Sequence, residues 1–171
     1  MSLESSLAVA RLVGSLEKIE GRKRLQKIVH LLKSKGYPEF DQEFSLHYYG
    51  PFSRQLAAQI DFLCHIELIK DVKDDAGAVY TYVPVRVEVK GEQLSALDAL
   101  DDKQNEPSWG SVAESLNEQD TSFLEALSTV VYLHKIRWEG ERLQQEFSRI
   151  KPDLAGKFQE VESYATEHEW I

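Results

Sequence analysis

The pattern of apolar and polar residues predicts three helices in the first third of the chain. Apolar side chains recur every third or fourth position over residues 3–19 and 22–35, which is the spacing of helices that bury one face. Gly36 is expected to end the second of these helices as a C-cap. Residues 54–65 repeat the pattern behind Ser53, whose hydroxyl suits the N-cap of a third helix.

Alternation with a period of two predicts short strands on either side of the third helix. The run from Phe44 to Tyr48 is predicted as a half-buried strand, and Gly50-Pro51 as the turn behind it. A turn is also predicted at 74–77, inside a hairpin. The remaining strands are predicted at residues 66–73, 79–83 and 85–89.

Beyond residue 90 the chain becomes polar and then helical. Residues 101–110 are rich in polar side chains and end in Pro and Gly, so they are predicted as a linker. Ser122 and Glu125 have the spacing of a capping box at a helix start. Helices are predicted at residues 94–100, 122–137, 139–150 and from Pro152 onward.

Together these elements predict an α+β fold that is mainly helical. Helix, turn, helix and hairpin in this order indicate a winged-helix-like module with a small β-hairpin wing over residues 1–90. Residues 91–110 are expected to form a short helix and a linker, and 111–171 a C-terminal helical cluster that packs on the first module.

Charge is distributed unevenly between the two halves. Residues 1–90 hold 13 Lys and Arg against 12 Asp and Glu (+1), and residues 91–171 hold 7 against 17 (−10), which together give the net charge of −9. Non-specific DNA affinity comes from Lys and Arg that displace counterions from phosphates. Any contact with nucleic acid is therefore expected from the front half alone.

A basic strip is the main candidate for such a contact. At about 100° per residue, the polar side chains of the second helix fall opposite its apolar face, and no acidic residue interrupts them. The residues expected to face outward are Arg22, Lys23, Gln26, Lys27, His30 and Lys33. The same pattern also fits a solvated helix face or a dock for an acidic protein surface.

Duplex DNA binding through residues 22–65 would use two groups of side chains. The third helix would be the reading helix, with base contacts from the side chains near its start. The candidates are Arg22, Lys23, Lys27 and Lys33 for phosphates, and Arg54, Gln55 and Gln59 for bases.

Aromatic side chains mark a possible protein-binding surface. Phe62 is predicted on the outward side of the third helix, where an aromatic ring indicates contact with a protein partner or with later parts of the chain. Tyr48, Tyr49 and Phe52 surround Gly50-Pro51 and are candidates for a ring-lined groove that binds a base or a peptide. A core cluster with hydrogen-bonded hydroxyls is the alternative.

The sequence offers no catalytic, cofactor or metal site. Cys64 is the one cysteine and is predicted on the inward face of its helix, as a small apolar residue. The histidines lack the spacing of metal ligands, and nucleotide-binding and nucleophile motifs are absent. No run approaches the roughly 18 apolar residues of a membrane span, and no signal peptide is recognised, so a cytoplasmic protein is expected.

Two segments resemble a known family. Residues 24–32, Arg-Leu-Gln-Lys-Ile-Val-His-Leu-Leu, are followed by residues 49–56, Tyr-Gly-Pro-Phe-Ser-Arg-Gln-Leu, and then by an apolar stretch at 63–69. In this order they resemble the YwgA-like family of uncharacterised bacterial proteins over residues 3–90. They are similar more distantly to the SocA-like or Panacea antitoxin domain, which has a related Lys-Leu-Gln-Lys helix and a Gly-Pro turn.

The resemblance implies a winged-helix-like regulatory or antitoxin-type module without catalysis. Two functions stay open at this point. One is a non-enzymatic regulator that binds duplex DNA. The other is an antitoxin- or adaptor-type module that binds a protein partner, or a second copy of itself, and no nucleic acid.

Overall fold

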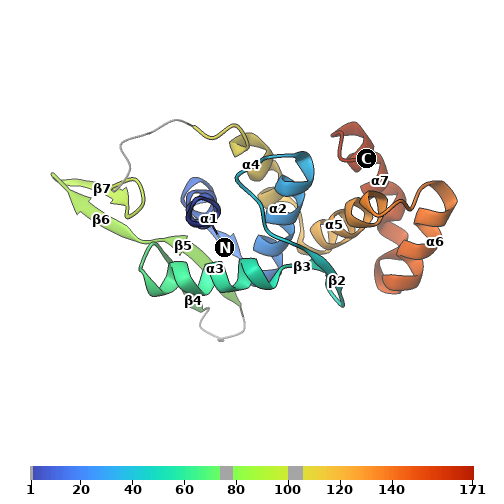
Figure 1. Cartoon of the computed structure of the whole chain (residues 1–171), viewed down its shortest axis with the longest axis horizontal. Coiled ribbons are helices and arrows are strands. Elements are labelled where there is room, and N and C mark those ends of the chain that lie inside the picture. Colours follow the sequence, from blue (N-terminus) through green and yellow to red (C-terminus); the bar gives the residue numbers. More distant parts are fainter. Residues whose placement is uncertain (1, 74–78, 100–105) are drawn as a thin grey trace.

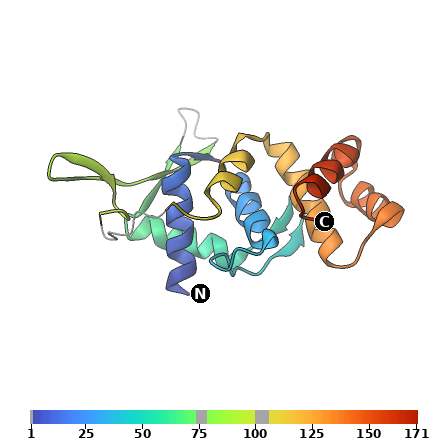
Figure 2. The ribbon, with the colours of Figure 1, turned by 90° about the horizontal axis from the view of Figure 1, so that it is seen from above.

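The computed structural model describes residues 2–73, 79–99 and 106–171. It has the mainly helical α+β fold that the sequence predicts, with small antiparallel sheets. The molecule is elongated, because a β-hairpin projects from one end and the last helices extend the other (Figures 1 and 2). The turn predicted at 74–77 and the linker residues 101–105 lie outside the described residues.

The N-terminal part has the predicted winged-helix-like order. Its elements are α1 (Leu3–Leu16), β1 (Ile19–Glu20), α2 (Arg22–Lys35), α3 (Arg54–His65), β4 (Ile69–Lys73) and β5 (Tyr80–Pro84). β5 lies between β1 and β4 in one antiparallel sheet, and Ile19 pairs with Tyr82. The sequence predicted α1 as far as Ile19; the structure ends it at Leu16, and the next residues form β1.

Local capping fixes the ends of α2 and α3 where they were predicted. Gly36 adopts the left-handed conformation with φ of 98°, and its N–H donates to the last carbonyl groups of α2. The Ser53 hydroxyl accepts a hydrogen bond of 3.1 Å from the N–H of Leu56 at the start of α3. Both signals act within a few residues, so the sequence alone suffices to place them.

A hairpin between α2 and α3 corrects the predicted turn. β2 (Ser45–His47) pairs with β3 (Gly50–Phe52), so Gly50-Pro51 is strand and the turn is at Tyr48-Tyr49. Proline is tolerated here because a two-stranded sheet consists of edge strands. Tyr48 is therefore at the hairpin tip with 81% of its surface exposed, and its prediction as a half-buried strand residue is wrong.

A second hairpin replaces the helix predicted at residues 94–100. β6 (Arg86–Val89) confirms the predicted strand, and it pairs with β7 (Glu92–Ser95). Lys90 and Gly91 both have positive φ, which is the backbone of the tight turns that join antiparallel strands. This hairpin is the projection at one end of Figure 1.

The C-terminal part is helical, as predicted, with one additional helix. Its elements are α4 (Gly110–Glu118), α5 (Thr121–Lys135), α6 (Gly140–Ile150), a 3-10 helix (Pro152–Lys157) and α7 (Phe158–Glu167). Asp120, rather than the predicted Ser122, caps α5 by accepting from the N–H of Phe123. Trp109, inside the predicted polar linker, is buried against Phe40, and α4 begins directly behind it.

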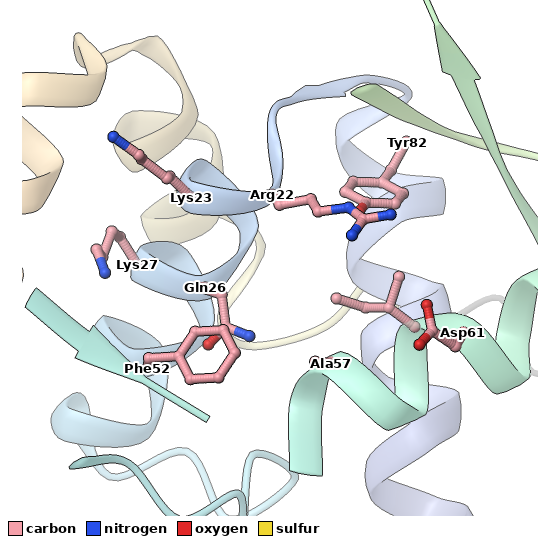
Figure 3. A pocket seen from close by; sticks show the side chains of 9 residues that line it. Arg22, Lys23, Gln26, Lys27, Phe52, Ala57, Asp61 and Tyr82 are labelled. Carbon is pink, nitrogen blue, oxygen red and sulfur yellow. The ribbon is translucent and has the colours of Figure 1, made fainter. Parts of the chain in front are cut away.

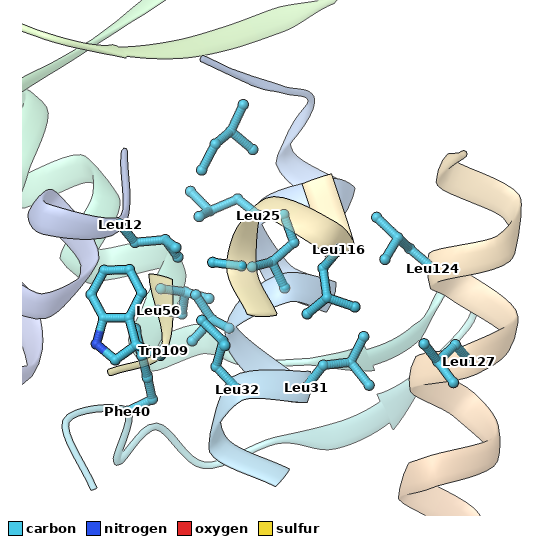
Figure 4. Packing of buried hydrophobic residues seen from close by; sticks show 14 of the residues in the cluster. Leu12, Leu25, Leu31, Leu32, Phe40, Leu56, Trp109, Leu116, Leu124 and Leu127 are labelled. Carbon is cyan, nitrogen blue, oxygen red and sulfur yellow. The ribbon is translucent and has the colours of Figure 1, made fainter. Parts of the chain in front are cut away.

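One hydrophobic core runs through the described residues. Helix α5 packs along α2, and α4 packs on both α1 and α2, so the front and back halves share the same apolar cluster. Figure 4 shows side chains of α1, α2, α4 and α5 meeting in it, among them Leu12, Leu25, Leu116 and Leu124. The domain boundaries near residues 90 and 110 stay a prediction.

Candidate functional site

Helix α2 is covered on the side that was predicted to face solvent. Every residue from Leu25 to Leu32 is buried, including Gln26, Lys27 and His30. The hairpin β2–β3 and helix α5 lie against this side of the helix. The prediction of an outward basic strip is therefore wrong at these three residues, since helical spacing cannot show which later segment will cover a polar face.

Two side chains of α2 hold the chain just behind the hairpin turn. The amide of Gln26 donates to the carbonyl oxygen of Ser53 at 3.0 Å and accepts from the N–H of Ser53 at 2.9 Å. The ammonium group of Lys27 donates to the carbonyl oxygen of Pro51 at 2.7 Å. The two segments that carry the family resemblance are thus bonded to each other.

A buried ion pair holds the turn from the other side. Lys151 pairs with Glu125 at 2.6 Å, and its ammonium group also donates to the carbonyl oxygen of Tyr48. We call Gln26, Lys27, Glu125 and Lys151 the hairpin anchor. Gly50 lies close against α5, because a Cβ atom there would be 2.7 Å from the hydroxyl oxygen of Thr129.

Burial changes the protonation of two α2 side chains. Desolvation lowers the pKa of Lys27 to about 8, although the nearby carboxylate of Glu125 acts against the shift. Desolvation likewise lowers the pKa of His30 to about 3. His30 is therefore neutral near pH 7, where its Nδ1 lies 2.9 Å from the Ser128 hydroxyl in a hydrogen bond. These groups act inside the fold and do not face a polyanion.

The structure separates the seven residues predicted to bind nucleic acid. Lys27 is 2% exposed and Gln59 is 0% exposed, so both are wrong as DNA contacts. The Gln59 amide is used inside the fold, where it bonds to Gln42 and Ser5. Lys33 donates to the carbonyl oxygens of the loop behind α2, at Asp41 and Gln42.

The open members of that set lie at the starts of two helices. Arg22 and Lys23 are exposed at the first turn of α2, and Arg54 is exposed at the first turn of α3. Gln55 is half-buried and accepts from the N–H of Glu43. Asp61 is exposed further along α3, so the surface of that helix carries both signs of charge.

Aromatic rings at the hairpin tip form the most exposed apolar feature near these cations. Tyr48 and Tyr49 stand edge to face with ring centroids 4.9 Å apart, and the Nζ of Lys23 lies 3.4 Å from the centroid of Tyr49. We call this pair the tyrosine platform. Phe62, in contrast, is half-buried and packs against the core, so its own chain covers most of the ring.

A groove of about 520 Å³ adjoins the platform. Its other walls come from Glu125 on α5 and from the end of α6 with the segment behind it. The groove thus combines apolar side chains with both signs of charge. Its lining residues besides the two tyrosines are Glu125, Arg149, Ile150, Lys151, Pro152, Asp153 and Leu154.

A second cavity, of about 180 Å³, lies between α2 and α3 (Figure 3). It is lined by Arg22, Lys23, Gln26, Lys27, Phe52, Ala57, Ile60, Asp61 and Tyr82. Burial raises the pKa of Tyr82 to about 12, so its hydroxyl stays protonated. No sequence pattern points to this cavity, because its walls come from four separate elements.

The described residues contain no gathering of three or more His, Cys, Asp or Glu side chains that could hold a metal ion. Within the same ranges, each helix is too short or too polar to cross a membrane. Cys64 is half-buried, and burial raises the pKa of its thiol, which leaves it protonated and unreactive near neutral pH. The predicted cytoplasmic location stays a prediction.

These features define an α+β protein with winged-helix-like order and an anchored, tyrosine-tipped hairpin. The sequence is 31% identical over 133 residues to the uncharacterized protein YwgA of Bacillus subtilis (strain 168), across 78% of this chain and 75% of that protein. The chain belongs to the YwgA-like family. No family model matches the sequence, and no solved structure matches the fold. The more distant similarity to the SocA-like or Panacea domain stays a prediction.

Proposed function

We propose that this protein is a non-enzymatic, adaptor-type interaction module that binds a protein partner at the tyrosine platform. The exposure of Tyr48 and Tyr49 carries the proposal, because tyrosine is among the residues that dominate binding energy at protein interfaces. Tyrosine supplies a large contact area with few rotatable bonds, so little conformational entropy is lost on binding. The predicted partner-binding role of these two residues is kept, whereas Phe62 is left out.

The support beneath the platform favours binding over a solvated turn. Lys151 bonds to the backbone of Tyr48, Lys27 to that of Pro51, and Gln26 to that of Ser53. A turn held in this way loses less freedom when a partner docks. The anchor therefore orients the two rings before any contact is made.

Charge next to the platform indicates the chemistry of the partner. Lys23 lies over the Tyr49 ring, and Arg22 is exposed beside it at the first turn of α2. An acidic segment that carries an apolar or aromatic side chain would meet both the rings and the cations. We therefore propose a partner with such an acidic segment.

DNA binding is a second candidate, favoured by one observation. Arg54 is exposed at the first turn of α3, the helix that would read bases in a winged-helix module. Against it stand the buried Lys27 and Gln59 and the exposed Asp61 on the same helix. Of the four predicted phosphate contacts, only Arg22 and Lys23 are exposed, so the protein partner is preferred.

Site-specific cross-linking in the native host cell tests the proposal. A photo-cross-linking amino acid at position 48 should give a discrete adduct with another protein, identified by mass spectrometry. The same group at position 114, exposed on α4, is the matched control. Tyr49→Ala and Lys23→Glu should each weaken the adduct, the second because it reverses the charge beside the ring.

Two outcomes would overturn the adaptor proposal. One is the same set of adducts from positions 48 and 114. The other is tight binding of duplex DNA at about 50 mM salt that Arg54→Ala abolishes, because low salt favours phosphate contacts. The second result would establish the DNA-binding candidate instead.

A further inference from the structure

The cavity between α2 and α3 combines an apolar interior with a cationic mouth. Phe52, Ala57, Ile60 and Tyr82 supply carbon surface from β3, α3 and β5. The first two turns of α2 supply the charged groups on the other side (Figure 3). We call this site the α2–α3 pocket.

Its volume limits what can enter. At about 180 Å³ the pocket is slightly larger than the engineered cavity of about 150 Å³ that holds benzene. It is smaller than the roughly 300–1,000 Å³ of sites for drug-sized ligands. A single ring or a short branched chain fits, and a nucleotide does not.

The charges that line the pocket favour an anion. Arg22, Lys23 and Lys27 oppose the single carboxylate of Asp61, which leaves a formal surplus of two positive charges. Among the described residues, none of the three cations forms an ion pair with a carboxylate. Lys27 is occupied by the carbonyl of Pro51, so Arg22 and Lys23 are the groups open at the mouth.

Aromatic contacts hold Arg22 in place. Its guanidinium carbon lies 4.4 Å from the ring centroid of Tyr80, and Figure 3 shows the group in front of the Tyr82 ring. The pKa of Arg22 is raised, chiefly by the charge that Tyr82 would carry once ionised and by a hydrogen bond to its hydroxyl, so the guanidinium is charged at any pH at which the fold is studied. A stacked, planar guanidinium has its N–H fork ready for a carboxylate.

We propose that the α2–α3 pocket binds a small organic carboxylate, with its ring or branched chain between Phe52, Ile60 and Tyr82 and its carboxylate at Arg22 and Lys23. This goes beyond the proposed adaptor function, because the ligand site is separate from the tyrosine platform except at Lys23. The same chemistry is present in a free small acid and in the C-terminal residue of a peptide.

Titration of the full chain with probe pairs tests the site. The probes are benzoate with benzamide, N-acetyl-leucine with its amide, and inorganic phosphate, followed by amide and methyl NMR signals. Saturable shifts around Phe52, Ala57 and Ile60 are expected with a carboxylate, with Kd of about 1 mM or below. The neutral amides should bind about tenfold more weakly, since they lack the charge-assisted bond to Arg22.

Three variants separate a specific site from general charge attraction. Arg22→Gln should weaken the binding of the carboxylate probe about tenfold and leave the weaker binding of the amide probe unchanged. Ala57→Phe should fill the pocket and abolish the binding of both probes. Arg142 is an exposed arginine on α6, and Arg142→Gln should leave the binding of both probes unchanged. If Ala57→Phe does not fold, Arg22→Gln alone decides the question, because Arg22 is exposed and its replacement leaves the core intact.

A comparison of a free small acid with a peptide distinguishes the source of the carboxylate. A peptide ending in leucine that binds more tightly than N-acetyl-leucine would indicate a partner's C-terminus, and equal or weaker binding a free small acid. The proposal is overturned if no carboxylate gives saturable shifts at the pocket, if phosphate competes equally well, or if Arg22→Gln has no effect. None of these results bears on cross-linking from position 48, so the two proposals fail separately.

Discussion

Lys23 and Lys27 are the same residue type one helical turn apart on α2, yet they have opposite environments. Lys23 is exposed, and its ammonium group lies over the Tyr49 ring. Lys27 is buried, and its ammonium group is bonded to the carbonyl oxygen of Pro51. Distant segments make the difference, because the hairpin and α5 cover the second turn of α2 and leave Arg22 and Lys23 of the first turn exposed.

The comparison shows that cationic side chains of one helix can have separate roles. A buried ammonium group is costly unless carbonyl groups or carboxylates compensate it, so Lys27 belongs to the structure that orients the hairpin. Lys23 bears no such cost and remains available for a ligand or partner. The hairpin anchor and the open first turn of α2 are therefore expected to respond to mutation in different ways.

The largest expected effect follows from breaking the buried ion pair of the anchor. Lys151→Met leaves the half-buried Glu125 without its partner at 2.6 Å, which should lower the free energy of unfolding by about 3–5 kcal/mol. Urea denaturation measures the change. Adding Glu125→Gln should restore part of the loss, because the unpaired charge is removed.

The pair of Glu146 with Arg149, whose side chain is 71% exposed, is the matched control for this prediction. Arg149→Gln should leave the urea midpoint nearly unchanged, since solvent screens the exposed guanidinium group. A loss for Lys151→Met as small as that for Arg149→Gln would show that the pair does not hold the hairpin.

Gly50→Ala is expected to have the next largest effect and to lower the free energy of unfolding by about 3 kcal/mol. The added Cβ would lie 2.7 Å from the Thr129 hydroxyl oxygen, and φ at this position is 81°. Crowding and a left-handed backbone each contribute about 1–2 kcal/mol. Differential scanning calorimetry or urea denaturation provides the measurement.

Gly36→Ala separates crowding from backbone strain. Gly36 also has positive φ, at 98°, but a Cβ there meets no atom within 4 Å. Gly36→Ala should lower the free energy of unfolding by about 1 kcal/mol, because only the left-handed backbone is strained. Equal losses at the two glycines would mean that the hairpin yields easily and that α5 does not hold it.

The pH dependence of stability tests the environment of Lys27. Its pKa is about 8 in the folded chain and 10.5 as a model value, so between these values the unfolded chain binds the proton that the folded chain has released. Stability should therefore rise with pH, by about 2 kcal/mol between pH 8 and pH 10. The raised pKa values of Tyr82, about 12 against 10, and of Cys64 act in the opposite sense, so a variant that lacks the Lys27 ammonium group is needed to isolate its contribution.

Lys27→Met removes the titrating group and keeps an unbranched side chain that is one atom shorter. Urea denaturation at several pH values should show that the rise between pH 8 and pH 10 is lost in this variant. Lys23→Met is the control and should retain the rise. Parallel curves for the wild type and Lys27→Met would contradict the buried position of the ammonium group.

Local signals explain which parts of this structure the sequence could predict. Helices α2 and α3 follow from apolar spacing together with Gly36 and Ser53, which act on their own neighbours. The hairpin could not be placed in the same way. Its close packing at Gly50 is set by Thr129 on α5, which is far away in the sequence. The start of α5 was predicted to within two residues. Asp and Ser can both cap a helix, so the sequence alone does not decide between Asp120 and Ser122.

Functional residues were harder to predict, because exposure depends on the whole fold. Gln59 has the sequence position of a base-reading residue, but Ser5 and Gln42 enclose it. Tyr82 forms part of the α2–α3 pocket only because β5 pairs next to β1. Arg22 and Lys23 are exposed, as predicted.

The smallest expected effect on stability belongs to Lys23, and it completes the comparison. Lys23→Gln removes an exposed charge, so it should change the free energy of unfolding by no more than about 0.5 kcal/mol. Lys27→Gln should cost about 1–3 kcal/mol, because the shorter amide cannot reach the carbonyl of Pro51 and leaves a buried polar group unpaired. Binding should show the reverse order, since Lys23→Gln weakens both the cross-link from position 48 and the carboxylate at the α2–α3 pocket. If Lys23→Gln lost stability and kept both binding activities, Lys23 would be one more structural residue, and the open turn of α2 would have no role in recognition.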